Sequence, residues 1–386
     1  MTEGSARMSG VPRVAILHAI VRDGGSSTRV GWWRDVLALQ GMDAVEVPLL
    51  SADRRILPRG FDQLAAVVAG AAAPETLSWS AAATRRALDV LRPDAVVVVT
   101  LRAYSASALG TVAARTPVIL DFVDRLSGSY RQRATIDARP LHRLAWGSLA
   151  RALARVENTV IARSPVAVAA GRGDAEHLGA TWLPITLPMA AVGPERPVRA
   201  SSEYRWDALF AGSLDYPPNV AAVRVLANDI WPEVQRLRPG SRLCVAGRRP
   251  TSEIRRLVTQ MGADLVPDFD DYRTLAGQTA LAITPLPLAT GLQIKVLDAA
   301  AAGVPQVISP AAAAGFAPGF PARTAPADAS FAESAVALLE DPASGALLAR
   351  DASAQVRSVY STEYWSPRIA TLFTPGGRAT WSDPLG

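Results

Sequence analysis

Short apolar segments alternate with polar or amphipathic stretches along most of this chain, and this alternation limits the possible folds more than any other feature. The apolar segments are strand-sized and nearly continuous in Val, Ile, Leu and Ala, which is typical of parallel strands covered on both faces. The pattern predicts an α/β fold built on parallel sheets. The first half contains VAILHAIV (14–21), DAVEVPLL (43–50), DAVVVVTL (94–101) and PVILDFVD (117–124).

The stretches between these strands carry loop and helix signals. The first strand is followed by a predicted loop, DGGSSTR (23–29), and by a predicted helix over 30–41 that ends at Gly41. Further helices are predicted over 76–93 and 144–160. The stretch 125–143 is polar and rich in Arg, and no helix is predicted for it.

A break in the pattern divides the chain in two. Residues 191–203 are rich in Pro, charge and small side chains and have no periodicity, which indicates an interdomain linker. A chain of 386 residues is also too long for one ordinary core. We expect two Rossmann-like domains facing across a cleft, over 1–190 and 204–360, with a tail over 361–386. The second domain contains YRWDALFAG (204–212), SRLCVAG (241–247), DLVPDF (264–269), TALAITPL (279–286) and PQVISP (305–310).

Composition indicates the compartment. No apolar run approaches the ~20 residues of a membrane helix, and no secretory signal is visible. Cys244 is the single cysteine, which suits the cytoplasm. The net charge is +5, but aromatic residues do not alternate with basic ones, which speaks against a nucleic-acid partner. Trp32 and Trp33 lie between arginines and allow two interpretations, core packing or peripheral contact with the inner face of a membrane.

The strongest functional signal follows the strand at 279–286. A loop containing Gly291 leads into a helix that carries Lys295 and Asp298, and Lys295 is the only lysine among 40 basic residues. A loop before a helix N-terminus favours anions, because unpaired N–H groups and the positive end of the helix dipole point to the same place. Lys295 and Asp298 share one helical face, so the ammonium is placed to contact a phosphate and the carboxylate a sugar diol.

These segments resemble a known family. Residues 204–345, with LFAGSLDYPPNVAAVRV and ITPLPLATGLQIKVLDAAAAGVPQVIS, are similar to the donor-binding domain of GT-B retaining glycosyltransferases of group 1 (GT4-like). The loop GG-x-x-x-R and the stretch VILDFVDRLSGSYRQRA are similar to one branch of that family. The segment STEYWSPRIATLF resembles the terminal helix that returns to the first domain in such enzymes.

The resemblance implies an enzyme that moves a sugar from a nucleotide-diphosphate-sugar to an acceptor hydroxyl. It implies a donor site in the second domain, with Lys295 beside the diphosphate and Asp298 at the ribose. The family usually has an acid where this chain has Thr290, and an Arg/Lys pair where it has GSLDYPPN (212–219). The remaining expected donor-site residues are Gly212, Ser213, Arg248 as a substitute cation, Val266, Asp268, Gly291, Leu292 and Gln293.

The chemistry expected is displacement of the nucleoside diphosphate with retention of configuration. Catalytic roles are expected for Lys295 and for Asp124, near the acceptor hydroxyl, although a helix cap or ion pair explains Asp124 equally well. Gly24, Gly25 and Arg29 are expected to face the acceptor, which is a glycan, a lipid-linked sugar or a small metabolite. No cofactor is expected, and no metal-ligand spacing occurs in the sequence.

Two other functions stay open. One is a sugar-nucleotide epimerase on the same fold, and the other is a non-catalytic relative that binds nucleotide sugar, which Thr290 favours. His18 is interpreted as a core imidazole. Gly171, Arg172 and Gly173 resemble a dinucleotide loop only superficially, because the third glycine is missing and no clear strand precedes them.

Overall fold

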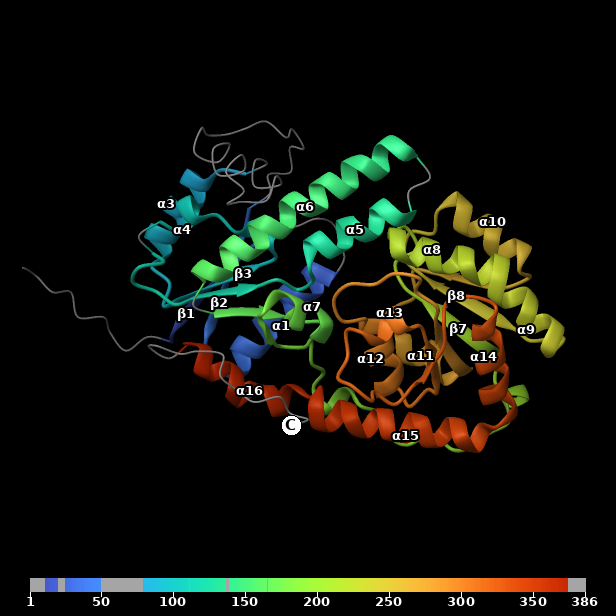
Figure 1. The fold of residues 1–386 in the computed structure, drawn as a ribbon. Helices are drawn as coiled ribbons and strands as arrows, with labels where there is room; N and C mark the ends of the chain where they lie inside the picture. The colour runs from blue at the N-terminus through green and yellow to red at the C-terminus, as the bar shows by residue number, and fades with distance from the viewer. Residues whose placement is uncertain are drawn as a thin grey trace, which may run out of the picture. The chain divides into compact units, whose positions relative to one another are not determined.

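The structure is a computed structural model that describes residues 11–19, 25–49, 79–110, 112–136, 139–164 and 166–373 (Figure 1). The chain forms two compact units. Unit 1 comprises the described residues of Met1–Ala170, Ala175–Leu183 and Trp365–Ser382. Unit 2 comprises those of Gly171–Asp174 and Pro184–Tyr364. Each unit has its own parallel sheet and core.

The sheet of unit 1 has the strand order β2-β1-β3-β4-β5-β6, and each neighbouring pair is parallel. This is the flavodoxin-like arrangement. Val, Ile and Leu side chains of β1 and β3 are fully buried, as a sheet covered on both faces requires. The strands are β1 (Arg13–His18), β2 (Asp43–Pro48), β3 (Ala95–Val99), β4 (Val118–Asp121), β5 (Val166–Ala169) and β6 (Thr181–Trp182). The helices are α1 (Gly25–Leu39), α3 (Ala81–Leu91), α4 (Ala106–Leu109), α5 (Leu126–Ile136), α6 (Pro140–Arg163), α7 (Arg172–Leu178), which begins in unit 2, and α16 (Thr362–Ala370).

Three expectations for unit 1 are wrong in detail. Helix α1 begins at Gly25, so residues 25–29 of the expected loop are helical. Helix α5 occupies 126–136, where no helix was predicted, because Ser and Gly interrupt its apolar pattern. Strand β4 ends at Asp121 rather than Asp124, because Val123 adopts a positive φ of 58° and turns the chain.

The aromatic residues expected either in the core or at a membrane are buried. Trp33 is 0% exposed and Trp32 is 7% exposed. Trp33 packs edge-on against Phe373, and Trp182 does the same against Trp365 from α16. The final helix therefore supplies part of the core of unit 1. The membrane interpretation of Trp32 and Trp33 is wrong.

The sheet of unit 2 has the order β12-β11-β10-β7-β8-β9, again with parallel neighbours. Counted within the unit, this is the order 6-5-4-1-2-3 of dinucleotide-binding folds. The strands are β7 (Trp206–Ala211), β8 (Leu243–Gly247), β9 (Asp264–Pro267), β10 (Thr279–Thr284), β11 (Gln306–Ile308) and β12 (Arg323–Thr324). The helices are α8 (Pro217–Val225), a π-helical turn (Leu226–Ile230), α9 (Trp231–Leu237), α10 (Ser252–Gln260), α11 (Tyr272–Gly277), α12 (Ile294–Ala301), α13 (Pro310–Ala313), α14 (Ser330–Glu340) and α15 (Pro342–Val359).

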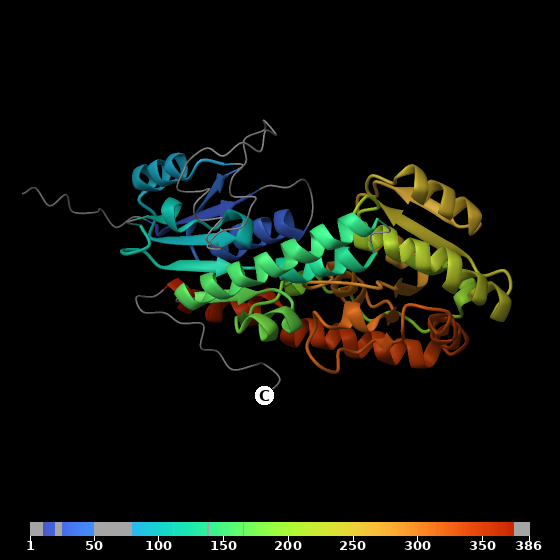
Figure 2. The same cartoon turned by 45° about the horizontal axis from the view of Figure 1, so that its top comes forward.

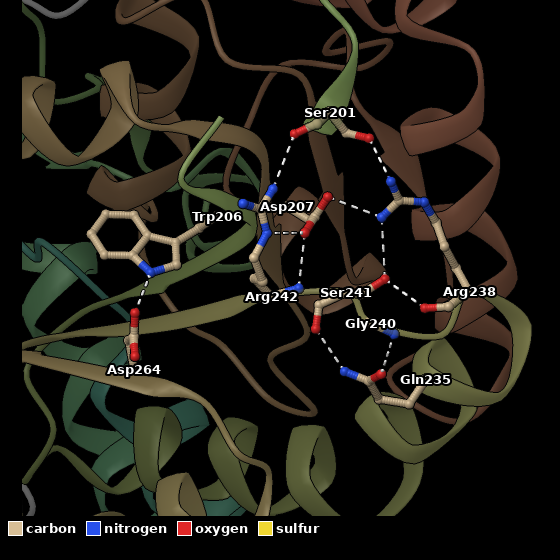
Figure 3. A network of polar contacts seen from close by, with 9 residues as sticks. All are labelled: Ser201, Trp206, Asp207, Gln235, Arg238, Gly240, Ser241, Arg242 and Asp264. Atoms are coloured by element: carbon tan, nitrogen blue, oxygen red, sulfur yellow. Dashed lines mark hydrogen bonds and ion pairs between the residues drawn. The ribbon is translucent and has the colours of Figure 1, made fainter. Parts of the chain in front are cut away.

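A polar network ties the start of this sheet to the preceding segment (Figure 3). Asp207, which is 2% exposed, accepts hydrogen bonds from Arg238 Nη1 at 2.9 Å and from Arg242 N and Nε at 2.8 and 3.0 Å. Arg238 Nη2 also donates to Ser201 Oγ at 2.7 Å. Burial raises the pKa of Asp207, but the bonds from Arg242 and Arg238 outweigh burial and hold that pKa below its ordinary value. Arg238 thus links the Asp207 carboxylate in β7 to Ser201 in the segment before the strand.

In the part of the chain that the structure describes, every helix is too short or too polar to cross a membrane.

Candidate functional site

The strand order of unit 2 marks one place for a ligand. The chain leaves β7 toward β8 on one side and leaves β10 toward β11 on the other, so the order reverses between β7 and β10. Open parallel sheets bind ligands outside the carboxyl ends of the strands at such a point. Here β7 ends at Ala211 and β10 at Thr284. The residues that follow are Gly212 and the loop leading to α12, which the sequence singled out.

Lys295 lies at this point. Its Nζ donates a hydrogen bond to Asn219 Oδ1 at 2.6 Å and lies 4.6 Å from the centroid of the Phe210 ring. Asn219 in turn donates from Nδ2 to the carbonyl oxygen of Ser213 at 2.9 Å, which fixes the direction of its amide. Among the described residues no carboxylate pairs with Lys295, and burial lowers its pKa to about 7. The site therefore holds a desolvated amine that an anionic ligand would stabilise in its charged form.

Close packing around Gly212 explains why a glycine directly follows β7. A Cβ atom at this position would lie 2.7 Å from Asn219 Nδ2 and 2.9 Å from Lys295 Nζ. Behind it, a Cβ at Gly247 would lie 1.7 Å from the carbonyl oxygen of Gly212. A side chain at either position would therefore collide with its neighbours, so both positions require glycine. Gly212 brings the backbone directly beside the ammonium.

The N-terminus of α12 lies next to Lys295 along the chain. Gln293 is its N-cap but makes no side-chain capping bond, and its Nε2 donates instead to the carbonyl oxygen of Thr290 at 3.0 Å. The first N–H groups of a helix have no partner within the helix. They add partial positive charge beside the ammonium. Helix end and lysine together form an anion-binding arrangement.

The Gly291 backbone is held by a carboxylate. Gly291 N donates to Asp174 Oδ2 at 2.7 Å, and Asp174 is 8% exposed. Gly291 has φ +67°, a conformation that favours glycine. Its N–H was expected to bind phosphate, but in this structure it binds Asp174. In the first turn of α12, Val296 N donates to Gln293 O at 2.9 Å, which leaves the N–H groups of Ile294 and Lys295 without an acceptor among the described residues.

The segment before Asp174 packs against the same loop. A Cβ at Gly171 would lie 2.8 Å from the carbonyl carbon of Gly291, and one at Gly315 would lie 2.3 Å from the carbonyl oxygen of Gly291. Arg172 N donates to Gly315 O, and Gly173 N donates to Ala314 O, each at 3.0 Å. This segment follows β5, so the expectation that no strand precedes it is wrong. Its glycines permit backbone-to-backbone contact.

Asp298 lies one turn after Lys295 and is half-buried. Burial raises its pKa to about 6. Its charge acts on Tyr272, whose pKa is raised by burial and by Asp298 and is lowered by Arg196. Two adjacent turns of α12 thus carry an amine with a depressed pKa and a carboxyl with an elevated pKa. Opposed shifts of this kind cluster at functional sites.

The other expected donor residues lie at strand ends of unit 2. Arg248 follows β8 with an exposed side chain, and among described residues no ion pair or side-chain hydrogen bond forms to it. Val266 is in β9 and packs on the core cluster around Trp206, while Asp268 just beyond has φ +49° and is exposed. Leu292 is buried. No cluster of His, Cys, Asp and Glu suited to a metal ion occurs within the described ranges.

In unit 1, Arg29 does not lie in a loop. Its side chain is 0% exposed within α1. Its Nε donates to Asp121 Oδ2 at 2.6 Å, and its Nη2 donates to the carbonyl oxygen of Leu183 at 2.8 Å. Trp33 Nε1 donates to the same Asp121 oxygen at 2.6 Å, and the Arg29 guanidinium lies 4.0 Å from the Trp32 ring centroid. The closed network ties α1 to β4, so Arg29 is buried in the core and does not face an acceptor.

The remaining acceptor-side expectations are partly outside the described structure. Gly24 lies outside the described residues, and Gly25 is the first residue of α1. Asp124 lies three residues beyond β4 and is half-buried. Its charge raises the pKa of Glu157, after the larger effect of burial, while bonds from Ser127 and the charge of Arg125 lower that pKa. His18 is 3% exposed and burial lowers its pKa, consistent with a neutral core imidazole.

The structure adds three residues that sequence reasoning missed. Asn219 and Phe210 hold the Lys295 ammonium, and Asp174 holds Gly291. Asn219 is the last residue of GSLDYPPN, the segment that stands where relatives have a basic pair, so its position was a usable signal. Asp174 follows the glycine segment that was rejected as a dinucleotide loop. Nothing in the sequence connects residue 174 to residue 291.

Comparison with known proteins agrees with this geometry. Residues 205–341 match the family model described as "Glycosyl transferases group 1". This range contains Gly212, Asn219, Lys295 and Asp298, the residues described above for the candidate site. No curated protein sequence matches the chain.

Solved structures resemble the chain over nearly its whole length. Sucrose-phosphate synthase from Thermosynechococcus elongatus has a TM-score of 0.68 at 13% identity, covering 94% of this chain and 98% of its own. HepE from Anabaena, in complex with UDP-glucose, has a TM-score of 0.60 at 15% identity, covering 93% and 98%. Trehalose-6-phosphate synthase from Burkholderia multivorans has a TM-score of 0.60 at 13% identity, covering 95% and 98%.

The fold and the position of the site define a GT-B glycosyltransferase architecture with two Rossmann-like units. Within it, the match over unit 2 is to the group 1 glycosyltransferases, which confirms the resemblance found in the sequence. The prediction that this chain is an enzyme of the transferase class is confirmed with it.

Proposed function

We propose that the chain transfers a sugar from a nucleotide-diphosphate-sugar, with UDP as the first candidate nucleotide, to an acceptor hydroxyl. The observation that carries this proposal is Lys295, an amine without a carboxylate partner among the described residues, held by Asn219 at the switch point of unit 2. An ammonium at this place, beside the open N-terminus of α12, suits the two negative charges of a diphosphate. The HepE structures, which contain UDP and UDP-glucose, support uridine.

The chemistry follows from the charge that develops as the sugar leaves. The diphosphate gains negative charge as the glycosidic bond breaks, so Lys295 and the first N–H groups of α12 stabilise the transition state. Removing one preorganised donor of this kind typically costs about 3–4 kcal/mol of activation free energy. Asp298 accepts hydrogen bonds from the ribose hydroxyls in this proposal. Because the lysine and helix supply the positive charge, the proposed reaction needs neither a metal ion nor a cofactor.

In this proposal the acceptor binds to unit 1. Asp124 is the carboxylate proposed near the attacking hydroxyl, with Gly24 and Gly25 beside the acceptor. We propose retention of configuration from the group 1 resemblance. The acceptor hydroxyl then attacks the anomeric carbon from the same face from which the leaving group departs. The acceptor class is a glycan, a lipid-linked sugar or a small metabolite. The proposed compartment is the cytoplasm, since a chain with one cysteine suits reducing conditions.

A ligand panel tests the proposal. Thermal unfolding is followed with UDP-, GDP-, dTDP- and ADP-glucose, for the unaltered chain and for Lys295→Met, which keeps the side-chain length. Ligand at a hundredfold excess over Kd adds about 2.7 kcal/mol to the free energy of unfolding. We expect stabilisation by one nucleotide family, lost in Lys295→Met and kept in Arg236→Met, a control whose side chain is 67% exposed. Equal stabilisation of the unaltered chain and Lys295→Met would refute the assigned site.

A further inference from the structure

Helices α5 and α6 carry an unusual concentration of exposed aliphatic side chains. Leu141 is 79% exposed, Leu144 is 68% exposed and Ile136 is 40% exposed. All three lie within nine residues, at the end of α5 and the start of α6. A single exposed leucine is normal on a protein surface, but two on successive turns of one helix form a patch. We call Ile136, Leu141 and Leu144 the aliphatic tip.

The two leucines of the tip lie on the face of α6 opposite to its buried face. Leu141 and Leu144 are three residues apart and therefore share one side of the helix. The buried side chains of α6 begin further along, at Ala150, Leu153 and Val156, and these point about 150° away around the helix axis. The core of unit 1 thus uses the other side of α6. The two leucines are not needed to fold the unit.

Aromatic contacts hold the two helices together near the tip. The rings of Tyr130 and Trp146 lie 5.6 Å apart, and the Arg133 guanidinium lies 5.0 Å from the Tyr130 centroid. The views in Figures 1 and 2 both show α5 and α6 side by side. The tip is therefore presented by two braced helices, a rigid support for an interaction surface.

Arginines are concentrated in and between the same two helices, four of them within residues 131–143. The described residues of the two helices and residue 139 include seven arginines, and their one acidic side chain, Glu157, is buried. Arg131 and Arg143 are exposed, and no described residue forms an ion pair with either of them. Asp137 lies between the helices in sequence and outside the described residues. The flanking arginines are Arg131, Arg133, Arg139 and Arg143.

We propose that the aliphatic tip and its flanking arginines dock unit 1 onto an anionic lipid bilayer. Exposed leucines flanked by arginine are the composition of surfaces that enter the bilayer interface, with guanidinium groups at the phosphates and aliphatic chains below them. Three aliphatic side chains are far too few for a protein interface, which buries about 1,200–2,000 Å². They are enough for reversible membrane contact. This contact is independent of the sugar-transfer reaction.

The test is flotation of the full chain with lipid vesicles. Vesicles of phosphatidylcholine are compared with vesicles in which roughly one third of the lipid is phosphatidylglycerol. We expect binding only to the anionic vesicles, weakening as salt is raised. The variant Arg131→Gln/Arg143→Gln loses about fivefold in affinity per charge, or about 30-fold in total. The variant Leu141→Glu/Leu144→Glu loses at least about tenfold, through lost insertion and repulsion.

Unit 1 also offers a control variant for this test. Val90→Glu places a carboxylate at another highly exposed aliphatic position, 85% exposed on α3, and should leave binding unchanged. Because all the substituted side chains are exposed, melting temperatures should stay close to that of the unaltered chain. Binding that ignores phosphatidylglycerol, or that survives both double variants, overturns the proposal. So does a dimer in solution that Leu141→Glu/Leu144→Glu dissociates, since a second copy would then cover the tip.

Discussion

Raising the pH should weaken donor binding through one side chain, Lys295. Burial lowers its pKa to about 7, so the ammonium loses its proton around neutrality instead of near its ordinary pKa of 10.5. The donor diphosphate needs the charged form. Binding therefore falls as pH rises, because an increasing share of the unliganded protein must first take up a proton.

The size of the effect follows from the protonated fraction. With a pKa of about 7, that fraction falls from roughly one half at pH 7 to roughly one thirtieth at pH 8.5. Affinity should fall about 16-fold over this interval, or about 1.6 kcal/mol in binding free energy. Asp298, with a pKa of about 6, is already mostly ionised at pH 7 and contributes little to the change.

Calorimetry with UDP-glucose measures both the affinity and the number of protons taken up on binding. Its diphosphate does not titrate in this interval, so the pH dependence belongs to the protein. At pH 8.5 binding should take up close to one proton, and the apparent enthalpy should then vary with the ionisation enthalpy of the buffer. Lys295→Met should bind weakly and show no pH dependence between 7 and 8.5.

Two results would refute this reasoning in different ways. A pH-independent affinity that Lys295→Met nevertheless abolishes would place the lysine at the donor and show that its pKa is not depressed. Equal affinity and equal pH dependence in Lys295→Met would remove Lys295 from the site altogether.

Three further substitutions test other contacts. Gly212→Ala should weaken UDP-glucose binding about tenfold, because its Cβ would lie 2.9 Å from Lys295 Nζ. Gly277→Ala, which has open space around it, should leave binding unchanged. Calorimetry measures both affinities, and equal losses would contradict the packing argument. Asp174→Ala should cost about 1.5–3 kcal/mol of unfolding free energy in urea, since Gly291 N–H loses a charged acceptor; an unchanged midpoint would show the bond to be unimportant. Asp207→Ala should cost about 3 kcal/mol of unfolding free energy, because Arg238 and Arg242 lose their carboxylate partner. The difference from the unaltered chain should persist at pH 4 and shrink only further below, because the pKa of Asp207 in the folded protein is held below the ordinary 3.8. A loss under about 1 kcal/mol would mean that both arginines find other partners.

The sheets were predictable because buried parallel strands leave an unmistakable sequence pattern. The segments VAILHAIV and AVVVV contain little besides β-branched and aliphatic residues. Residues 14–18 of the first and all of the second are buried strand residues. Helix α5 was not predictable in this way. Its stability comes from packing against α6 rather than from its own apolar stripe, and packing partners cannot be read from LSGSYRQRATI alone.

The proposed donor site was partly predictable for a similar reason. Gly291, Lys295 and Asp298 follow one another along a single strand-loop-helix unit, so local spacing places them correctly. The contacts of Lys295 with Asn219, and of Gly291 with Asp174, join residues 76 and 117 positions apart. Arg29 failed as an acceptor-side residue because its carboxylate partner, Asp121, lies 92 positions away on β4. Contacts over such separations depend on the tertiary fold.

The solitary lysine has a practical consequence. A chain with 39 arginines and one lysine offers amine-directed reagents a single side chain, besides the terminal amine. With a pKa of about 7, Lys295 is largely uncharged and nucleophilic at pH 8, where ordinary lysines are protonated. Acylation or reductive alkylation at that pH would therefore label Lys295 as the one side chain, together with the terminal amine, whose ordinary pKa is about 8. The extent of labelling, read by mass spectrometry, would report directly on occupancy of the site.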